Sequence, residues 1–199
     1  AIPVVPAFMR GKKISSADAI CCTRYHTIGQ ILMRMMKRSD NLYAESLFYH
    51  LAASQRRPAK AAYAAEIMKK LLQKIGVTHT NYRIADGSGL SLYNYQTADM
   101  QIRLLRYAYQ NANIFEHLYP SLPIAGVDGT LQKRMRNTIC HDNVRGKTGT
   151  LTGISSLSGY LTAANGNVIA YAIINQGVMR AAHAKTMQDR ICQALCEYK

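Results

Sequence analysis

The apolar residues between positions 28 and 51 recur at helical spacing with one interruption. The first set is spaced i, i+3, i+4, i+7 and i+8, which places its members on one face of a helix. That set is Ile28, Ile31, Leu32, Met35 and Met36. The pattern stops at Ser39-Asp40-Asn41 and resumes from Leu42 to Leu51. We therefore predict two helices that meet at Ser39-Asp40-Asn41, the first with its apolar face in the core.

Two further helices are indicated downstream. Pro58 opens a helical pattern near residues 59–75, which Gly76 would end as a C-terminal cap. Its predicted buried side is Ile67, Met68, Leu71, Leu72 and Ile75. Thr97 is a suitable N-cap for a helix over residues 98–109. An irregular stretch is predicted from Pro120 and Pro123 to residue 130.

The last third of the chain has the pattern of an antiparallel meander. Strands are predicted over residues 144–150, 154–163 and 167–175, and a closing helix over 181–196. Asn165-Gly166 is a signal for a type I′ hairpin turn between the last two strands. The order of elements predicts an α/β fold, with an antiparallel sheet flanked by helices.

Composition and charge narrow the class of protein. The 199 residues are 48% apolar and 18% charged, which is typical of a globular chain, and the formal charge is +14. Such a charge suits an acidic partner: a nucleic acid, an anionic membrane surface or an acidic polymer such as cell-wall material. A merely basic soluble surface explains it equally well. The basic residues are scattered and form no recognised nucleic-acid-binding motif, so we expect no nucleic-acid partner.

Cysteine and histidine spacing argues against a metal site. The five cysteines include no C-x-x-C pair, and the six histidines include no H-E-x-x-H motif. We expect no metal and no cofactor. Cys192 and Cys196 lie one helical turn apart, and the odd count leaves the disulfide pairing open.

Two tripeptides carry candidate chemistry. Ser39-Asp40-Asn41 lies at the predicted helix junction, and Lys147-Thr148-Gly149 lies on a predicted strand. Each has an ordinary explanation when taken alone, the first as a helix N-cap and the second as a strand end. Their joint occurrence in these contexts matches two of the three motifs of penicillin-binding proteins and class A β-lactamases.

Four longer strings extend the match. They are residues 35–47, 86–91, 122–131 and 145–151, in that order along the chain. Together they resemble the D-alanyl-D-alanine carboxypeptidase/endopeptidase family, the class C low-molecular-mass penicillin-binding proteins. The resemblance implies a β-lactamase/penicillin-binding transpeptidase-like fold. It also implies that residues 28–199 are the C-terminal part of the DD-peptidase domain and that residues 1–27 end an upstream region or insertion.

The resemblance assigns roles to residues of both tripeptides. Ser39 would pass a proton toward the leaving amine, Asn41 would hydrogen-bond the substrate amide, and Lys147 would supply positive charge. Thr148 would bind the substrate carboxylate with its hydroxyl. Gly149 would let the substrate backbone approach the strand edge, and the Thr150 backbone N–H would donate to the oxyanion. The residues 86–91 loop is expected to shape the wall of the cleft.

The chain departs from the family in one respect. No Ser-x-x-Lys occurs in the 199 residues, and the nearest string is Thr130-Leu131-Gln132-Lys133, which we interpret as a loop element. In the family this motif supplies the nucleophile and lies upstream. We therefore expect a truncated site that is inactive alone and is incomplete as a fold without the upstream segment.

The resemblance also implies partners and an activity. The activity is that of a serine-type D-Ala-D-Ala carboxypeptidase in the periplasm. Partners would be peptidoglycan stem peptides, β-lactam antibiotics, and either the upstream segment or a second copy of the chain. Two alternatives remain open: a non-catalytic module that binds cell-wall peptides, and a basic nucleic-acid-binding domain favoured by charge alone.

Overall fold

The computed structural model describes residues 2–3 and 25–199, and its main sheet is the meander that the sequence predicts. The strands β3 (Arg145–Leu151), β4 (Ile154–Thr162) and β5 (Val168–Gln176) form one antiparallel sheet in the order β3-β4-β5. Its register places Lys147 opposite Ser158 and Ser158 opposite Ala172. The predicted α/β class and strand order are confirmed.

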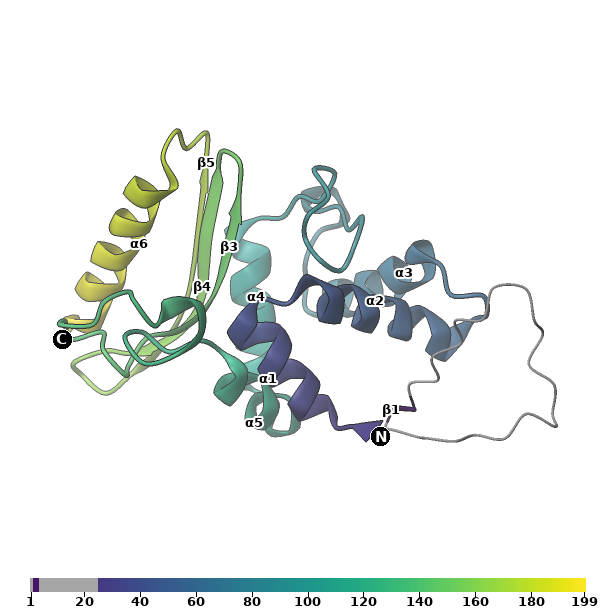
Figure 1. Ribbon diagram of the computed structural model, residues 1–199, viewed down its shortest axis with the longest axis horizontal. Helices are drawn as coiled ribbons and strands as arrows, with labels where there is room; N and C mark the ends of the chain where they lie inside the picture. Colours follow the sequence, from purple (N-terminus) through teal and green to yellow (C-terminus); the bar gives the residue numbers. More distant parts are fainter. Residues whose placement is uncertain (1, 4–24) are drawn as a thin grey trace.

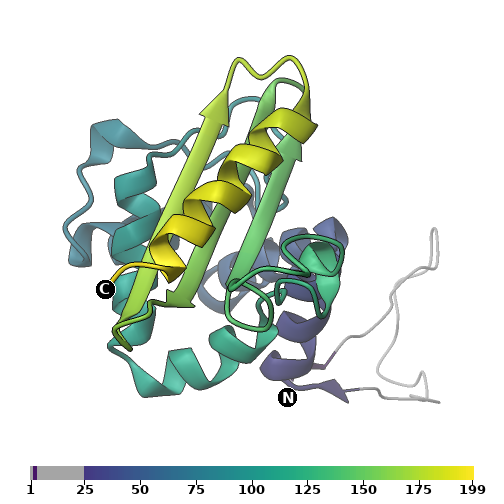
Figure 2. The same cartoon turned by 90° about the vertical axis from the view of Figure 1, so that its left-hand side faces the viewer.

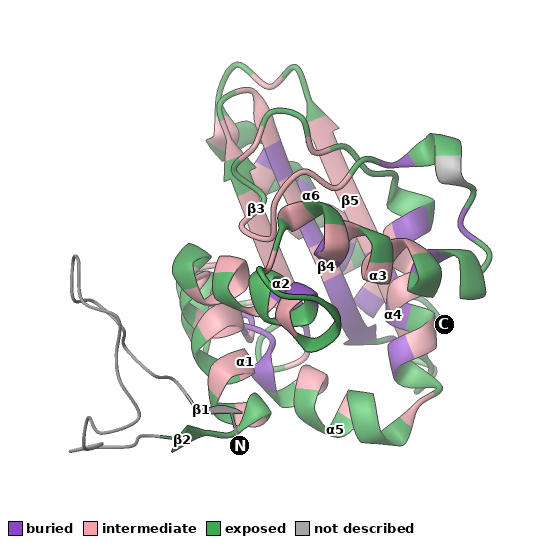
Figure 3. Ribbon diagram, turned by 90° about the vertical axis from the view of Figure 1, so that its right-hand side faces the viewer, coloured by how far each residue is buried: buried purple, intermediate pink, exposed green. Residues whose placement is uncertain are grey.

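The sheet lies between two helical layers (Figures 1 and 2). Helix α6 (Ala181–Cys196) covers one face, and α4 (Ala98–Tyr109) and α5 (Ala112–Ser121) pack on the other. Burial alternates along β4, because successive side chains of a strand point to opposite faces. Leu157 and Leu161 belong to the core beneath α6, whereas Tyr160 packs with Leu105 of α4. In Figure 3 the buried residues are accordingly prominent along β4.

The N-terminal helices form a second cluster beside the sheet. Helix α1 (Ile28–Arg38) leads into α2 (Asn41–Gln55), which packs against α3 (Ala61–Lys74). The predicted junction at Ser39-Asp40-Asn41 is confirmed. Gly76 follows α3 with a φ of +79°, and the N–H of Val77 donates to the Leu72 carbonyl, as in a glycine-capped helix end.

Two burial predictions for these helices were wrong. No residue of α1 is fully buried, because α1 packs beside α5 and α2 and not flat on the sheet, so its apolar face is only partly covered. On α3, Leu71 is 38% exposed, and the fully buried residues are Ala64 and Leu72. Helical spacing identifies a face, but the neighbouring elements decide how much of it is covered.

Two local predictions were also wrong. Helix α5 was not predicted; it includes Pro120 in its last turn, where the lost N–H bond affects only the end of the helix. The turn at Asn165-Gly166 is not type I′, since Asn165 lacks the required positive φ. The Gly166 N–H donates to the Ala163 carbonyl and only Gly166 has a positive φ, so the loop is a three-residue connection.

The predicted segment 1–27 falls largely outside the described residues. Its described parts are the strands β1 (Ile2–Pro3) and β2 (Tyr25–His26), which pair with each other, and Thr27, which caps α1. The division of the chain at residue 28 stays a prediction. No helix of the described ranges is long and apolar enough to cross a bilayer.

Candidate active site

Ser39 and Lys147 meet although 108 residues separate them in sequence. The Lys147 ammonium donates to the Ser39 hydroxyl oxygen at 2.7 Å and to the Thr148 carbonyl at 2.6 Å. The helix junction and strand β3 therefore contribute to one site. The two tripeptides are joined by a direct hydrogen bond, as a shared chemical role requires.

Ser39 is held in an unusual backbone conformation. It is the C-cap of α1 with φ 53° and ψ 49°, the left-handed region that costs a residue with a side chain about 1–2 kcal/mol. The next residue, Asp40, is the N-cap of α2, and its carboxylate accepts from the Tyr43 N–H. The capping interpretation of the tripeptide is therefore correct for Asp40, while the adjacent Ser39 side chain faces Lys147.

This geometry predicts an unusual pair of substitution effects. Ser39→Gly and Ser39→Ala both remove the hydroxyl, but only glycine relieves the left-handed strain, so we expect Ser39→Gly to be more stable by about 1 kcal/mol. Urea denaturation of the two variants measures the difference. At the exposed helical position Ser46 in α2 the order should reverse, with alanine the more stable by about 1 kcal/mol. Equal stabilities at position 39 would contradict the strain.

Lys147 is a cation in a poorly solvated place. Burial lowers its pKa from the ordinary lysine value. Its two hydrogen-bond acceptors are neutral oxygens, and no carboxylate among residues 25–199 forms a salt bridge with it. An ammonium without a counter-ion in a cleft favours binding of an anionic group, which would restore the electrostatic balance.

All six residues singled out in the sequence line one cleft of about 420 Å³. They are Ser39, Asn41, Lys147, Thr148, Gly149 and Thr150. Arg83, Asp86 and Leu90 also line this cleft. Asn41 is the first residue of α2 and is exposed, so its amide is accessible from the cleft. The structure thus brings the predicted residues together, while their catalytic and substrate-binding roles stay predictions.

The open edge of β3 supplies backbone donors to this cleft. The sheet order makes β3 an edge strand, and the Gly146 N–H points away from β4 because it donates to the Pro123 carbonyl. Donor direction alternates along a strand, so the N–H groups of Thr148 and Thr150 point to the same open side. The Thr150 N–H therefore has the orientation that an oxyanion donor needs.

Gly149 leaves room for a neighbouring side chain of the sheet as well as for a substrate. A Cβ at this position would lie 2.5 Å from the Ser156 hydroxyl oxygen of β4. The family resemblance explains the glycine by the approach of a substrate backbone. The structure shows a further reason within the sheet itself.

A second set of contacts, which the sequence does not predict, joins the two halves of the site. The Lys37 ammonium donates to the Asp128 carboxylate at 2.7 Å and to the Leu122 carbonyl at 2.6 Å. Thr130, two residues after Asp128, accepts a hydrogen bond at 2.9 Å from the Thr148 hydroxyl. These contacts tie the end of α1, next to Ser39, to strand β3. Lys37 and Asp128 lie in the matched strings, but a single sequence does not show that they pair.

Two carboxylates shape the loop at residues 86–91. The Glu45 carboxylate of α2 accepts from the N–H groups of Gly87 and Ser88, both at 2.9 Å. Burial alone would raise the pKa of Asp86, but hydrogen bonds from Asn94 and from loop donors outweigh it and lower the pKa. The loop is therefore fixed by hydrogen bonds among its own residues and to Glu45 and Asn94, in keeping with the expected role as a wall of the cleft. Across the described residues, no three His, Cys, Asp or Glu side chains gather as metal ligands would.

Comparison with known proteins gives a consistent picture. The sequence model of the D-Ala-D-Ala carboxypeptidase 3 (S13) family matches residues 3–198. The D-alanyl-D-alanine carboxypeptidase DacB of Haemophilus influenzae is 39% identical over 144 residues, which are 71% of this chain and 30% of that protein. The D-alanyl-D-alanine carboxypeptidase of an Actinomadura species is 36% identical over 86% of this chain and 32% of its own length. The chain thus spans about a third of these relatives.

Solved structures share the fold. Penicillin-binding protein 4 (dacB) of Haemophilus influenzae, in complex with a β-lactam, superposes with a TM-score of 0.77 at 34% identity, covering 84% of this chain and 41% of that one. The TLA-3 extended-spectrum β-lactamase gives a TM-score of 0.61 at 19% identity, covering 86% of this chain and 62% of that one. The predicted β-lactamase/penicillin-binding transpeptidase-like fold is confirmed.

Proposed function

Because the chain belongs to the D-Ala-D-Ala carboxypeptidase 3 (S13) family, we propose that it is the substrate-binding part of a serine-type D-Ala-D-Ala carboxypeptidase. Its substrates are peptidoglycan stem peptides, which it cleaves through an acyl-enzyme, and β-lactams acylate the same site. We propose the periplasm as its location, because a peptidoglycan substrate requires access to the cell wall. The activity is proposed for the complete protein, since the chain spans about a third of its curated relatives.

The uncompensated ammonium of Lys147 carries this proposal. A peptide ending in D-Ala-D-Ala presents a terminal carboxylate, and Lys147 offers it a charged donor at the open edge of β3. The Thr148 hydroxyl would add a neutral donor by exchanging its hydrogen bond to Thr130 for one to the carboxylate. The scissile carbonyl is one residue further in, and its oxygen would accept from the Thr150 N–H. Asn41, which lines the same cleft, is available to the substrate amide.

The chemical step follows from these positions. A serine oxygen attacks the carbonyl carbon of the D-Ala-D-Ala bond, and its proton passes to a basic lysine nitrogen. The C–N bond then breaks, and Ser39 hands a proton to the leaving amine, so D-alanine departs as a neutral amine before ionising. Water hydrolyses the remaining ester and regenerates the serine. The Ser39 hydroxyl oxygen lies 2.7 Å from the Lys147 ammonium, which can replace the proton that Ser39 gives up.

We place the nucleophile outside the 199 residues, on a Ser-x-x-Lys segment encoded upstream. The nearest internal string does not replace it: Thr130 lies in a short 3-10 helix with its hydroxyl engaged by Thr148, and Lys133 is exposed. A largely apolar cavity of about 450 Å³ lies between β3–β5, α4 and α5, and Lys147 is part of its lining. We propose that the upstream helix occupies this cavity and so brings its serine beside Lys147 and Ser39.

D-alanine release tests the proposal. The chain expressed together with its upstream coding sequence is expected to release D-alanine from a pentapeptide ending in D-Ala-D-Ala, and the 199-residue chain alone is expected to release none. The matched control is the same peptide with an amidated C-terminus, which Lys147 cannot bind as an anion. Binding without release by the joined protein would favour the alternative, a non-catalytic module that binds cell-wall peptides. Equal turnover of the amidated peptide would contradict the role of Lys147.

A further inference from the structure

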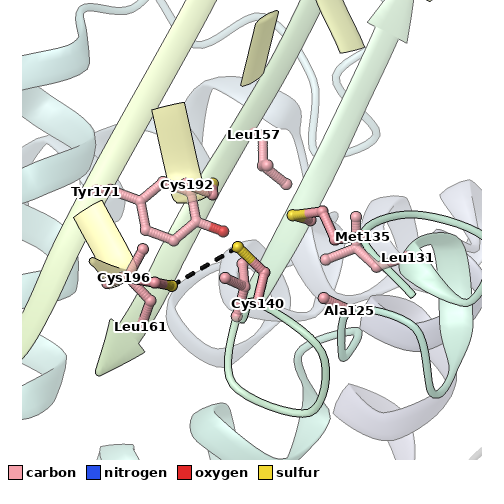
Figure 4. Close-up of a cluster of buried hydrophobic side chains, with 10 residues drawn as sticks. Ala125, Leu131, Met135, Cys140, Leu157, Leu161, Tyr171, Cys192 and Cys196 are labelled. Atoms are coloured by element: carbon pink, nitrogen blue, oxygen red, sulfur yellow. Dashed lines mark hydrogen bonds between the residues drawn. The ribbon is translucent and has the colours of Figure 1, made fainter. Parts of the chain in front are cut away.

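Three thiols lie together in the core on the α6 side of the sheet, and none of them lines the cleft (Figure 4). Cys140, Cys192 and Cys196 are all buried and free. Cys140 and Cys196 are in direct contact, with their sulfur atoms 3.7 Å apart. A disulfide has its sulfurs about 2.0 Å apart, so these two are separated by little more than a side-chain adjustment.

The backbone on both sides of this contact is well anchored. Cys140 lies in the turn before β3, and its carbonyl accepts from the N–H of Val144 at 3.0 Å. Cys196 is the last residue of α6. Asn143 bridges the two segments, since its side-chain amide donates to the Thr162 carbonyl at 2.8 Å and lies 3.5 Å from the Cys196 sulfur. The pairing of Cys140 with Cys196 is therefore set by the fold.

We propose that Cys140 and Cys196 are a disulfide-forming pair that joins the end of α6 to the turn preceding β3. The oxidant is an organic disulfide, such as oxidised glutathione or the disulfide of a thiol oxidoreductase. One cysteine thiolate attacks it, forms a mixed disulfide and releases one thiol. The second cysteine thiolate then attacks the mixed disulfide and releases the other thiol. Two protein thiols and one disulfide thus become one protein disulfide and two thiols.

The bond has to form while the chain folds. Burial raises the pKa of the Cys140 thiol and raises that of Cys196 to about 12, so the native protein holds almost no thiolate there at neutral pH. An incompletely folded chain has ordinary thiols that react freely. Cys192 lies one turn before Cys196, with its thiol against the Tyr171 hydroxyl, and remains the unpaired cysteine of the cluster.

The bond would close a loop that contains the whole sheet. Residues 140–196 include β3, β4, β5 and α6, so the cross-link restricts the unfolded chain over all of these elements. It would also fix the turn that leads into the strand carrying Lys147. This inference concerns the core and does not depend on the proposed peptidase activity.

Refolding in a glutathione buffer tests the pair. The parent is the full chain with Cys21→Ser and Cys22→Ser, which lie outside the described residues, so that only the three core thiols remain. After refolding with oxidised glutathione we expect a mass lower by two hydrogens, one free thiol, and a proteolytic fragment linking residues 140 and 196. The thermal midpoint should exceed that of the reduced protein by on the order of 5–10 °C.

Single variants separate the three cysteines. Cys192→Ser should keep the mass loss and the thermal shift, whereas Cys140→Ser and Cys196→Ser should abolish both. Three free thiols after oxidative refolding of the parent would overturn the proposal. A cross-link that involves Cys192 in the parent would overturn it equally. Because the readout is mass and melting, a failure here is distinguishable from a failure of the peptidase assay.

Discussion

Lys147→Met is expected to slow acylation by penicillin by on the order of 10²–10³-fold in the protein that carries both the cleft and an upstream Ser-x-x-Lys. The substitution removes a charge-assisted bond to the ligand carboxylate and the hydrogen bond to Ser39. Charge-assisted bonds contribute about 1.5–3 kcal/mol each, and about 1.4 kcal/mol corresponds to a factor of ten in rate. Mass spectrometry of the acyl-enzyme against time measures the rate. Lys70→Met, at an exposed position on α3, is the matched control and should have no effect.

The same variant separates function from folding. The desolvated Lys147 ammonium costs free energy in the folded state, so its replacement by an apolar side chain of similar length should leave the free energy of unfolding unchanged or raise it. Urea denaturation checks this. A variant that loses both acylation and stability would show that Lys147 is structural, and one that keeps acylation would remove it from the site.

The lowered pKa of Lys147 also sets a pH dependence. Binding of a carboxylate needs the protonated amine, so acylation should fall as the pH rises through the folded-state pKa, which is below the ordinary lysine value of 10.5. The stability of the folded state changes with pH in the opposite direction. Between the folded and unfolded pKa values the unfolded chain binds more protons, so the folded state gains stability as the pH rises, and Lys147→Met should lack this gain.

The local patterns of the sequence predicted most of the fold. The meander from β3 to β5, helix α6 and the junction between α1 and α2 all follow from spacing and turn signals within a few residues of each element. Helix α5 is not predicted because Pro120 and Pro123 indicate an irregular stretch, whereas the structure has Pro120 within the last turn of the helix. Whether the apolar face of α1 is buried depends on packing partners elsewhere in the chain.

The residues of the site were predicted from a family resemblance, whereas the fold was predicted from local patterns. The roles suggested for Ser39 and Lys147 came from a family resemblance, and the structure adds that their side chains touch. The ion pair between Lys37 and Asp128 joins residues 91 positions apart, and no pattern in one sequence predicts such a pair. The positive φ of Ser39 was equally invisible, since serine has no preference for that conformation.

The central claim is that residues 25–199 hold the substrate side of an acyl-serine site whose nucleophile is supplied from upstream. Intact-mass spectrometry after incubation with labelled penicillin tests it most directly. Acylation needs a nucleophile with a base in hydrogen-bond reach, and removing such a nucleophile costs several orders of magnitude in rate. The basic side chain that contacts the Ser39 hydroxyl within residues 25–199 is Lys147, which donates a hydrogen bond to it and does not accept one.

The measurement compares the 199-residue chain alone with the chain joined to its upstream coding sequence. We predict no mass gain for the chain alone and a gain of one penicillin per molecule for the joined protein. In the joined protein, peptide mapping should place the label on the serine of the upstream Ser-x-x-Lys. Stoichiometric labelling of the chain alone would contradict the account and would make Ser39 the first candidate for the nucleophile.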